Sequence, residues 1–146
     1  MSLRPHAACA VAWLLVPVVA MGQSRWERQV QARLAQTSAT LATSGYATAP
    51  GTATGQLDNG EMAGDTVTLA AGATYVLVGA CDDDCRDLEL GLFAANGYEV
   101  DAARGAGNAP IVRVTPHETQ RYRFTVRMTG CGKNPCWYGV RLFARK

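Results

Sequence analysis

The stretch RYRFTVRM, residues 121–128, alternates strictly between apolar and polar side chains. The apolar set is Tyr122, Phe124, Val126 and Met128, and the polar set is Arg121, Arg123, Thr125 and Arg127. In a β-strand successive side chains point to opposite faces, so one face of this strand is expected in a core and the other in water. The stretch therefore predicts a strand of an antiparallel sheet with one buried face.

Similar alternation recurs along the chain between turn signals such as Asp58-Asn59-Gly60 and Asn96-Gly97. Strands are predicted at 55–57, 65–70, 74–80, 88–94, 98–102, 111–115, 121–128 and 137–144. About eight short strands with breaks every ten residues or so favour an antiparallel β-sandwich over residues 55–146. The strands at 121–128 and 137–144 are expected to form a hairpin whose tip is fixed by Cys131 and Cys136.

The segment before the strands has a helical period. Trp26, Val30, Leu34 and Leu41 recur at spacings of four, four and seven, which predicts one amphipathic helix over residues 23–45. Ser24 is a candidate N-cap and Gly45 a candidate stop. Residues 46–54 are rich in Ala, Thr and Gly, and we expect a linker there.

Residues 1–22 have the composition of a secretory signal: a single early positive charge, an apolar run of about a dozen residues, and small residues before a cleavage point at Gln23. We expect a periplasmic or secreted protein without a transmembrane anchor after cleavage. The formal charge of the whole chain, +2, gives no case for nucleic-acid binding.

The expected mature chain contains four cysteines: Cys81, Cys85, Cys131 and Cys136. An even number in an exported protein indicates two disulfides. Three connectivities are possible, and we favour the local pairs Cys81 with Cys85 and Cys131 with Cys136. A zinc site and a redox pair are the alternatives, but neither spacing matches the usual motifs.

Four runs together resemble the bacterial pre-peptidase C-terminal domain. They are GDTVTL (64–69), AGATYVL (71–77), DLELGLF (87–93) followed by Asn96-Gly97, and QRYRFTV (120–126). The resemblance implies a small secreted, jelly-roll-like β-sandwich that serves as a noncatalytic accessory or binding module, in some members with calcium. This chain departs from the family pattern at Glu89, where the second Asp of the motif is usual, and at Gly91.

Residues 81–89, CDDDCRDLE, form what we call the acidic loop. Five carboxylates, those of Asp82, Asp83, Asp84, Asp87 and Glu89, are concentrated there. Calcium prefers several oxygen ligands on a bendable loop, so the sequence makes these residues candidate calcium ligands. The alternative interpretation is a solvated acidic turn that prevents pairing between sheet edges.

A second candidate site consists of arginines on two predicted strands, namely Arg121, Arg123, Arg127, Arg141 and Arg145. Whether the two sets join into one basic face depends on register. A joined face would suit an acidic glycan or an envelope protein. The alternative is the water-facing side of a sheet.

Catalytic groups are few. Serines occur only at positions 2, 24, 38 and 44, which excludes a serine triad in the β-rich part. His117 is the single histidine after the signal and lies on a polar turn. We therefore predict a noncatalytic exported binding or accessory domain of the cell envelope or extracellular space. Two alternatives stay open: a small exported hydrolase using the acidic loop, and an inhibitor of an envelope enzyme.

Overall fold

The computed structural model describes residues 23–146, so the predicted signal at 1–22 lies outside the described residues. One helix, α1 (Arg25–Thr43), precedes eight strands. The strands are β1 (Ala47–Leu57), β2 (Met62–Leu69), β3 (Thr74–Cys81), β4 (Cys85–Phe93), β5 (Glu99–Ala103), β6 (Ile111–Val114), β7 (Gln120–Cys131) and β8 (Cys136–Arg145).

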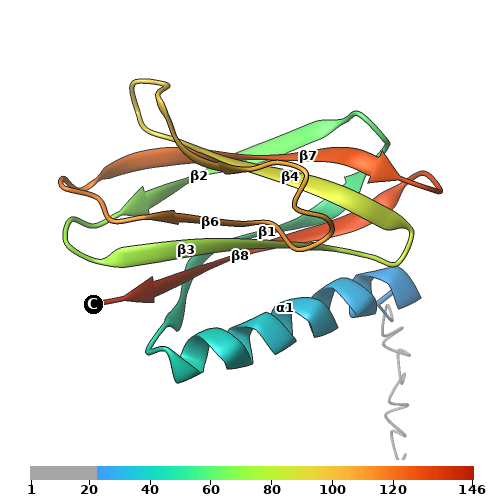
Figure 1. Ribbon diagram of the computed structural model, residues 1–146, viewed down its shortest axis with the longest axis horizontal. Coiled ribbons are helices and arrows are strands. Elements are labelled where there is room, and N and C mark those ends of the chain that lie inside the picture. Colours follow the sequence, from blue (N-terminus) through green and yellow to red (C-terminus); the bar gives the residue numbers. More distant parts are fainter. Residues whose placement is uncertain (1–22) are drawn as a thin grey trace, which may run out of the picture.

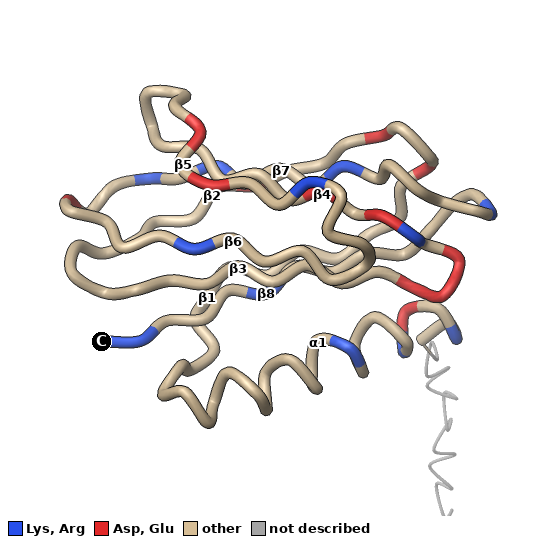
Figure 2. The backbone as a smooth tube through the Cα atoms, in the orientation of Figure 1, with Lys and Arg blue, Asp and Glu red and all other residues tan. Residues whose placement is uncertain are grey.

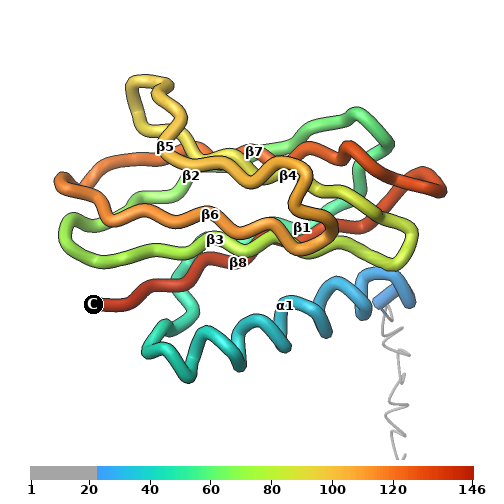
Figure 3. Tube along the Cα trace, viewed as in Figure 1, coloured from blue at the N-terminus to red at the C-terminus, as the bar shows by residue number. Residues whose placement is uncertain are grey.

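The strands form two antiparallel sheets that face each other, as Figure 1 shows. Sheet A has the order β1-β8-β3-β6, and sheet B has the order β2-β7-β4-β5. The tube in Figure 3 follows the chain as it alternates between the two layers. The predicted mainly β, antiparallel sandwich with one helix before it is confirmed.

The alternation in residues 121–128 divides β7 as expected. Tyr122, Phe124, Val126 and Met128 are buried between the sheets. They pack with the inward side chains of β8, such as Val140 and Leu142, in one core cluster. The outward arginines of β7 are exposed.

The predicted linker at 46–54 is wrong, because most of it belongs to the edge strand β1, which pairs with β8. Alternating Thr and Ala side chains are small enough for a half-buried edge strand. The register shifts between Ala49 and Thr52. Gly51 lies there at φ +126°, and a Cβ in its place would come within 2.8 Å of the Val67 side chain. Glycine thus permits an irregularity within β1. The small residues around it led to the prediction of a linker.

The predicted hairpin of the last two strands is also wrong. β7 pairs with β2 and β4 in sheet B, while β8 pairs with β1 and β3 in sheet A. The short connection 132–135 therefore crosses between the sheets. Both strands supply buried residues to the same core. Two strands can do so from opposite sheets as well as from neighbouring positions in one sheet, so the alternation of apolar residues did not distinguish the two arrangements.

Helix α1 begins after Ser24, whose side chain accepts a hydrogen bond from the Glu27 amide, as a cap residue should. The helix lies along the outer face of sheet A (Figure 1). Val30 and Leu34 are buried there against Val76 and Phe143. Within residues 23–146, no helix has the length and apolar character needed to cross a membrane.

Gly139 of β8 sets how closely the helix approaches the sheet. A Cβ at this position would lie 2.8 Å from Val30 Cγ1 and 2.9 Å from Leu34 Cδ1. Because such distances are too short for carbon atoms, only a residue without a side chain lets these two helix residues reach the backbone of β8. Helix α1 thereby covers the outer face of sheet A along β8 and β3, while within residues 23–146 no helix packs on the outer face of sheet B.

Candidate functional site

The four cysteines form two local disulfides, Cys81–Cys85 and Cys131–Cys136, which confirms the favoured pairing. Cys85 and Cys131 are also register partners between β4 and β7. Both bridges therefore lie at the same end of the sandwich. All four cysteine side chains are therefore in disulfides, and each disulfide closes one of two adjacent loops.

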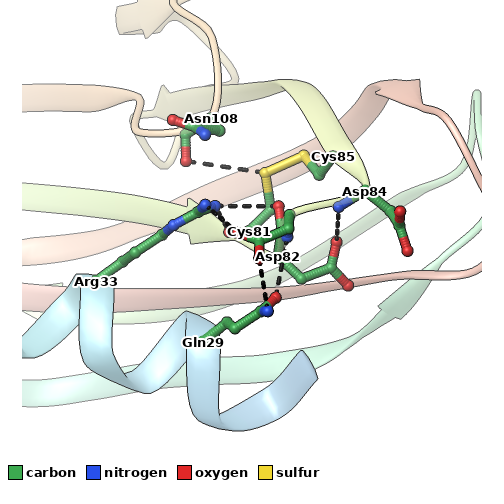
Figure 4. A network of polar contacts seen from close by, with 8 residues as sticks. Gln29, Arg33, Cys81, Asp82, Asp84, Cys85 and Asn108 are labelled. Carbon is green, nitrogen blue, oxygen red and sulfur yellow. Dashed lines mark hydrogen bonds and ion pairs between the residues drawn. A yellow bond between two sulfur atoms is a disulfide. The ribbon is translucent and has the colours of Figure 1, made fainter. Parts of the chain in front are cut away.

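Asp82, in the acidic loop, is turned inward rather than toward solvent. It is 1 % exposed, and its Oδ2 accepts a hydrogen bond from the Trp137 amide at 2.7 Å. Its Oδ1 accepts one from the Asp84 amide at 3.1 Å. Buried carboxylates need such donors, because water cannot reach them. Asp82 thus joins the start of β8 to the turn that the first disulfide closes. Figure 4 shows its contact with Asp84 in that turn.

Asp83 points instead to helix α1. Its Oδ1 accepts a hydrogen bond from Arg33 Nη2, and its Oδ2 accepts one from Gln29 Nε2, each at 2.6 Å. Gln29 Oε1 in turn accepts the Asp83 amide proton at 3.1 Å. Arg33 also donates to the carbonyls of Cys81 and Asp82. Figure 4 shows Gln29 and Arg33 reaching from the helix into this loop.

Asp87 has a third set of partners. Thr129 Oγ1 donates to its Oδ2 at 2.6 Å, and the Gly107 amide donates to its Oδ1 at 3.0 Å. Three of the five candidate calcium ligands therefore accept hydrogen bonds from different parts of the protein. Among the described residues, no three Asp, Glu, His or Cys side chains are grouped as a metal site requires. The calcium site stays a prediction.

The two sets of arginines lie on different sheets. Arg121, Arg123 and Arg127 project from β7 on the outer face of sheet B, whereas Arg141 and Arg145 belong to β8 in sheet A. The five arginines accordingly do not form one continuous face. Figure 2 shows the basic positions on opposite layers of the sandwich.

The β8 arginines are occupied with the helix segment. Arg141 donates to Ser38 Oγ at 3.0 Å and to Gln31 Oε1 at 3.2 Å. The Arg145 guanidinium lies 4.7 Å from the ring centre of Tyr46. These contacts assign Arg141 and Arg145 to the attachment of α1, since their donors face the helix and the residues that follow it.

The β7 arginines remain on the exposed face. The Arg123 guanidinium lies 4.8 Å from the ring centre of Phe93, a cation–π arrangement. Arg121 donates to Thr66 Oγ1 at 3.3 Å. Arg127 stands opposite Met62 on one side and Glu89 on the other. Met62, at 62 % exposure, is among the most exposed large apolar side chains of the described residues.

A depression of about 160 Å³ lies beside these groups, and Gly91, Thr125, Arg127 and Phe93 are among the residues that line it. Arg104 lines it too and forms an ion pair with Glu99. The hydrogen bonds from Arg104 hold the pKa of Glu99 below its usual range. Sequence reasoning missed Phe93 and Arg104. The parity of β4, which puts Glu89, Gly91 and Phe93 on one side, would have indicated Phe93.

His117 lines a different and larger pocket of about 410 Å³, near the turn between β6 and β7. The other wall residues include Val100, Val114, Glu118 and Tyr122. Tyr122 and Gln120 are hydrogen-bonded to each other through their side chains at 3.2 Å. His117 itself is exposed, as expected for a residue on a polar turn.

No family model and no curated protein sequence matches this chain. Among solved structures, it is similar to PliG of Aeromonas hydrophila, a periplasmic lysozyme inhibitor of g-type lysozyme. The match has 12 % sequence identity and a TM-score of 0.49, and it covers 65 % of this chain and 85 % of the other. A likeness at this level assigns no function. The resemblance to the pre-peptidase C-terminal domain stays a prediction.

Proposed function

We propose that this protein is a noncatalytic, exported binding domain that holds an acidic glycan of the cell envelope or extracellular space on the outer face of sheet B. The observation that carries the proposal is the position of Arg121, Arg123 and Arg127. These three guanidinium groups share one exposed strand face, while the corresponding face of sheet A is covered by helix α1.

The chemistry of this face suits carboxylate or sulfate groups on a chain of sugars. Arginine offers several donors in a fixed planar arrangement that matches such oxygens. Within a β-strand, alternate residues are about 6.6 Å apart along the strand, so Arg121 and Arg123 present donors to successive parts of an extended chain. Phe93 beside Arg123 adds an apolar surface for a sugar ring.

Export is supported by the two disulfides, because such bonds persist in oxidising compartments.

A noncatalytic role is supported by the contacts of the acidic side chains. Asp82, Asp83 and Asp87 accept hydrogen bonds from Trp137, Arg33 and Thr129, and these contacts join elements of the fold. Carboxylates used in this way are poorly placed to attack or protonate a substrate.

The test is binding of a polyuronate and of heparin to the protein, measured by calorimetry at low salt. A variant with Arg121→Gln, Arg123→Gln and Arg127→Gln should lose at least about tenfold in affinity, equivalent to about 1.4 kcal/mol. Parent affinity should fall as salt is added, because exposed charges are screened.

The matched control is Arg113→Gln, which removes one positive charge from an exposed position on β6 in sheet A. Its affinity should stay that of the parent. Equal binding by the triple variant and the parent would refute the proposal, and binding of an acidic protein but of neither glycan would assign the face to a protein partner.

The two alternatives make different predictions. A hydrolase that used the acidic loop would lose turnover when Asp83, Asp84 and Asp87 are replaced by Ala. An inhibitor would slow an envelope enzyme at near-equimolar concentration, which an assay with a peptidoglycan-cleaving enzyme measures directly. Neither result depends on the β7 arginines, so the three functions can be told apart.

A further inference from the structure

A cleft of about 230 Å³ opens at the end of the molecule where both disulfides lie. Its walls come from four separate segments: the start of α1, the end of β1, the acidic loop, and the crossing between β7 and β8. The lining side chains that matter for recognition are Trp26, Trp137, Asp84, Lys133, Gln56 and Asn134. This cleft shares no lining residue with the depression beside the β7 arginines.

The walls are held in place by covalent bonds and hydrogen bonds. Cys81–Cys85 closes the loop that carries Asp84, and Cys131–Cys136 closes the loop that carries Lys133 and Asn134. The Asp84 carbonyl accepts a hydrogen bond from the Gly132 amide at 2.8 Å, which joins the two loops directly. A binding site built this way loses little freedom when a ligand enters.

The aromatic walls are fixed as well. The buried carboxylate of Asp82 accepts the amide proton of Trp137 and so holds the start of β8. Trp26 lies in the first turn of α1, one turn before Gln29, which is bonded to Asp83. Arg25 lies over the Trp26 ring at 5.2 Å from its centre. The network around the acidic loop therefore positions the backbone at Trp137 and the first turns of α1, which carry Trp26.

Within the described residues, the Asp84 carboxylate accepts no hydrogen bond, unlike those of Asp82, Asp83 and Asp87. Asp84 is half-buried and lines the cleft, and its carboxylate has hydrogen-bonding capacity to spare. Gln56 and Asn134 add amide groups that can both donate and accept. Asn134 is oriented by the Asn59 amide, which donates to its Oδ1 at 2.9 Å.

From this arrangement we infer that the cleft binds a neutral saccharide unit. Two half-exposed indoles offer flat apolar surfaces with few rotatable bonds, the kind of surface that dominates recognition sites. One carboxylate and several amides match the hydroxyl groups of a sugar. Asp84 and Lys133 balance each other in charge, which favours an uncharged ligand. The volume is below the 300 Å³ or so typical of drug-sized ligands, in keeping with one sugar ring.

The test is nuclear magnetic resonance of the exported protein during titration with chitotriose, cellotriose and maltotriose to about 10 mM, since weak sites have dissociation constants near 1 mM. The indole N–H signals of Trp26 and Trp137 should move in a saturable way with at least one of these probes. Trp26→Ala and Asp84→Asn should each weaken binding about tenfold or more. Both positions are partly exposed, and Asp84→Asn preserves the shape of the side chain.

Arg113→Gln is the matched control, because Arg113 is exposed on β6, lines neither the cleft nor the depression, and should leave sugar affinity unchanged. Failure of all three sugars to move either indole signal would overturn the inference, as would unchanged affinity in both Trp26→Ala and Asp84→Asn. If the parent protein binds one of these neutral sugars but not the polyuronate, the proposed function is refuted and the inference about the cleft stands. The two tests are independent, because the sugars used for the cleft carry no charge and the arginine face is tested with acidic glycans.

Discussion

Arg33 of helix α1 and Asp83 of the acidic loop are joined by a 2.6 Å contact between Nη2 and Oδ1, across 50 positions of sequence. The same guanidinium donates to the carbonyls of Cys81 and Asp82, so one side chain holds three acceptors of the loop. This contact connects helix α1 to the turn that the Cys81–Cys85 disulfide closes. Arg33 and Asp83 should contribute unequally to stability.

Replacing Arg33 by Ala is expected to cost about 1–2 kcal/mol of unfolding free energy, because two carbonyls lose a charged donor. Asp83→Ala should cost less than about 1 kcal/mol, since an exposed ion pair contributes little and this carboxylate is 53 % exposed. Urea denaturation measures both values. Gln36→Ala, at an exposed position of the same helix, serves as the control and should change stability by less than about 0.5 kcal/mol.

Asp82→Ala should destabilise the protein more strongly, by about 2–4 kcal/mol, because the amides of Trp137 and Asp84 each lose an acceptor in a buried place. Asp82→Asn keeps one acceptor oxygen and should fall between the parent and Asp82→Ala. Thermal and urea melts of the three proteins give the comparison. Equal stability of parent and Asp82→Ala would contradict the structural role given to this carboxylate.

Gly139→Val should push helix α1 away from sheet A, since even a Cβ would lie within 3 Å of Val30 and Leu34. Hydrogen exchange of the amides in α1 should speed up while that of β7 stays near the parent's. Leu34→Ala is the companion variant, expected to cost about 2–4 kcal/mol through the cavity it leaves. Unchanged exchange in α1 of Gly139→Val would mean that the helix adapts by sliding.

Calcium removal tests the prediction made for the acidic loop. An ion bound there would compete with the donors that orient the carboxylates of Asp82, Asp83 and Asp87 toward different parts of the fold, so we expect the melting temperature to differ by less than about 2 °C between millimolar calcium and excess chelator. A bound ion at a hundredfold its dissociation constant would instead stabilise by about 2.7 kcal/mol. A shift of several degrees, absent from the variant with Asp84→Ala and Asp87→Ala, would establish the site.

Local patterns in the sequence were sufficient for the helix, for most of the strands and for the buried face of β7. The period of two over residues 121–128 predicted which side chains of β7 reach the core, and Ser24 marked the start of the helix. Local patterns were insufficient to predict which strands pair with each other. Nothing in the composition of residues 46–54 distinguishes a linker from an edge strand, because that distinction depends on the pairing with β8.

The candidate sites were limited in the same way. Three of the five carboxylates in the acidic loop, those of Asp82, Asp83 and Asp87, accept hydrogen bonds from Trp137, Arg33 and Thr129, each more than 40 residues away in sequence. Likewise, the arginines of β7 and β8 separate because the chain crosses from one sheet to the other between residues 131 and 136. Side chains can be assigned to a strand face from sequence, but the surface that they share depends on strand order.

Both disulfides, the crossing between β7 and β8 and the contact of Arg33 with the acidic loop are found at one end of the sandwich. At the other end, the turns at 70–73 and 115–119 also pass from one sheet to the other and are joined by hydrogen bonds from Gly72 to Pro116 and from Ala71 to Thr119. Disulfides therefore reinforce the first end, whereas hydrogen bonds alone join the two turns at the second. On heating, the turns at the second end should lose their structure first, and the cleft between the tryptophans should keep its shape.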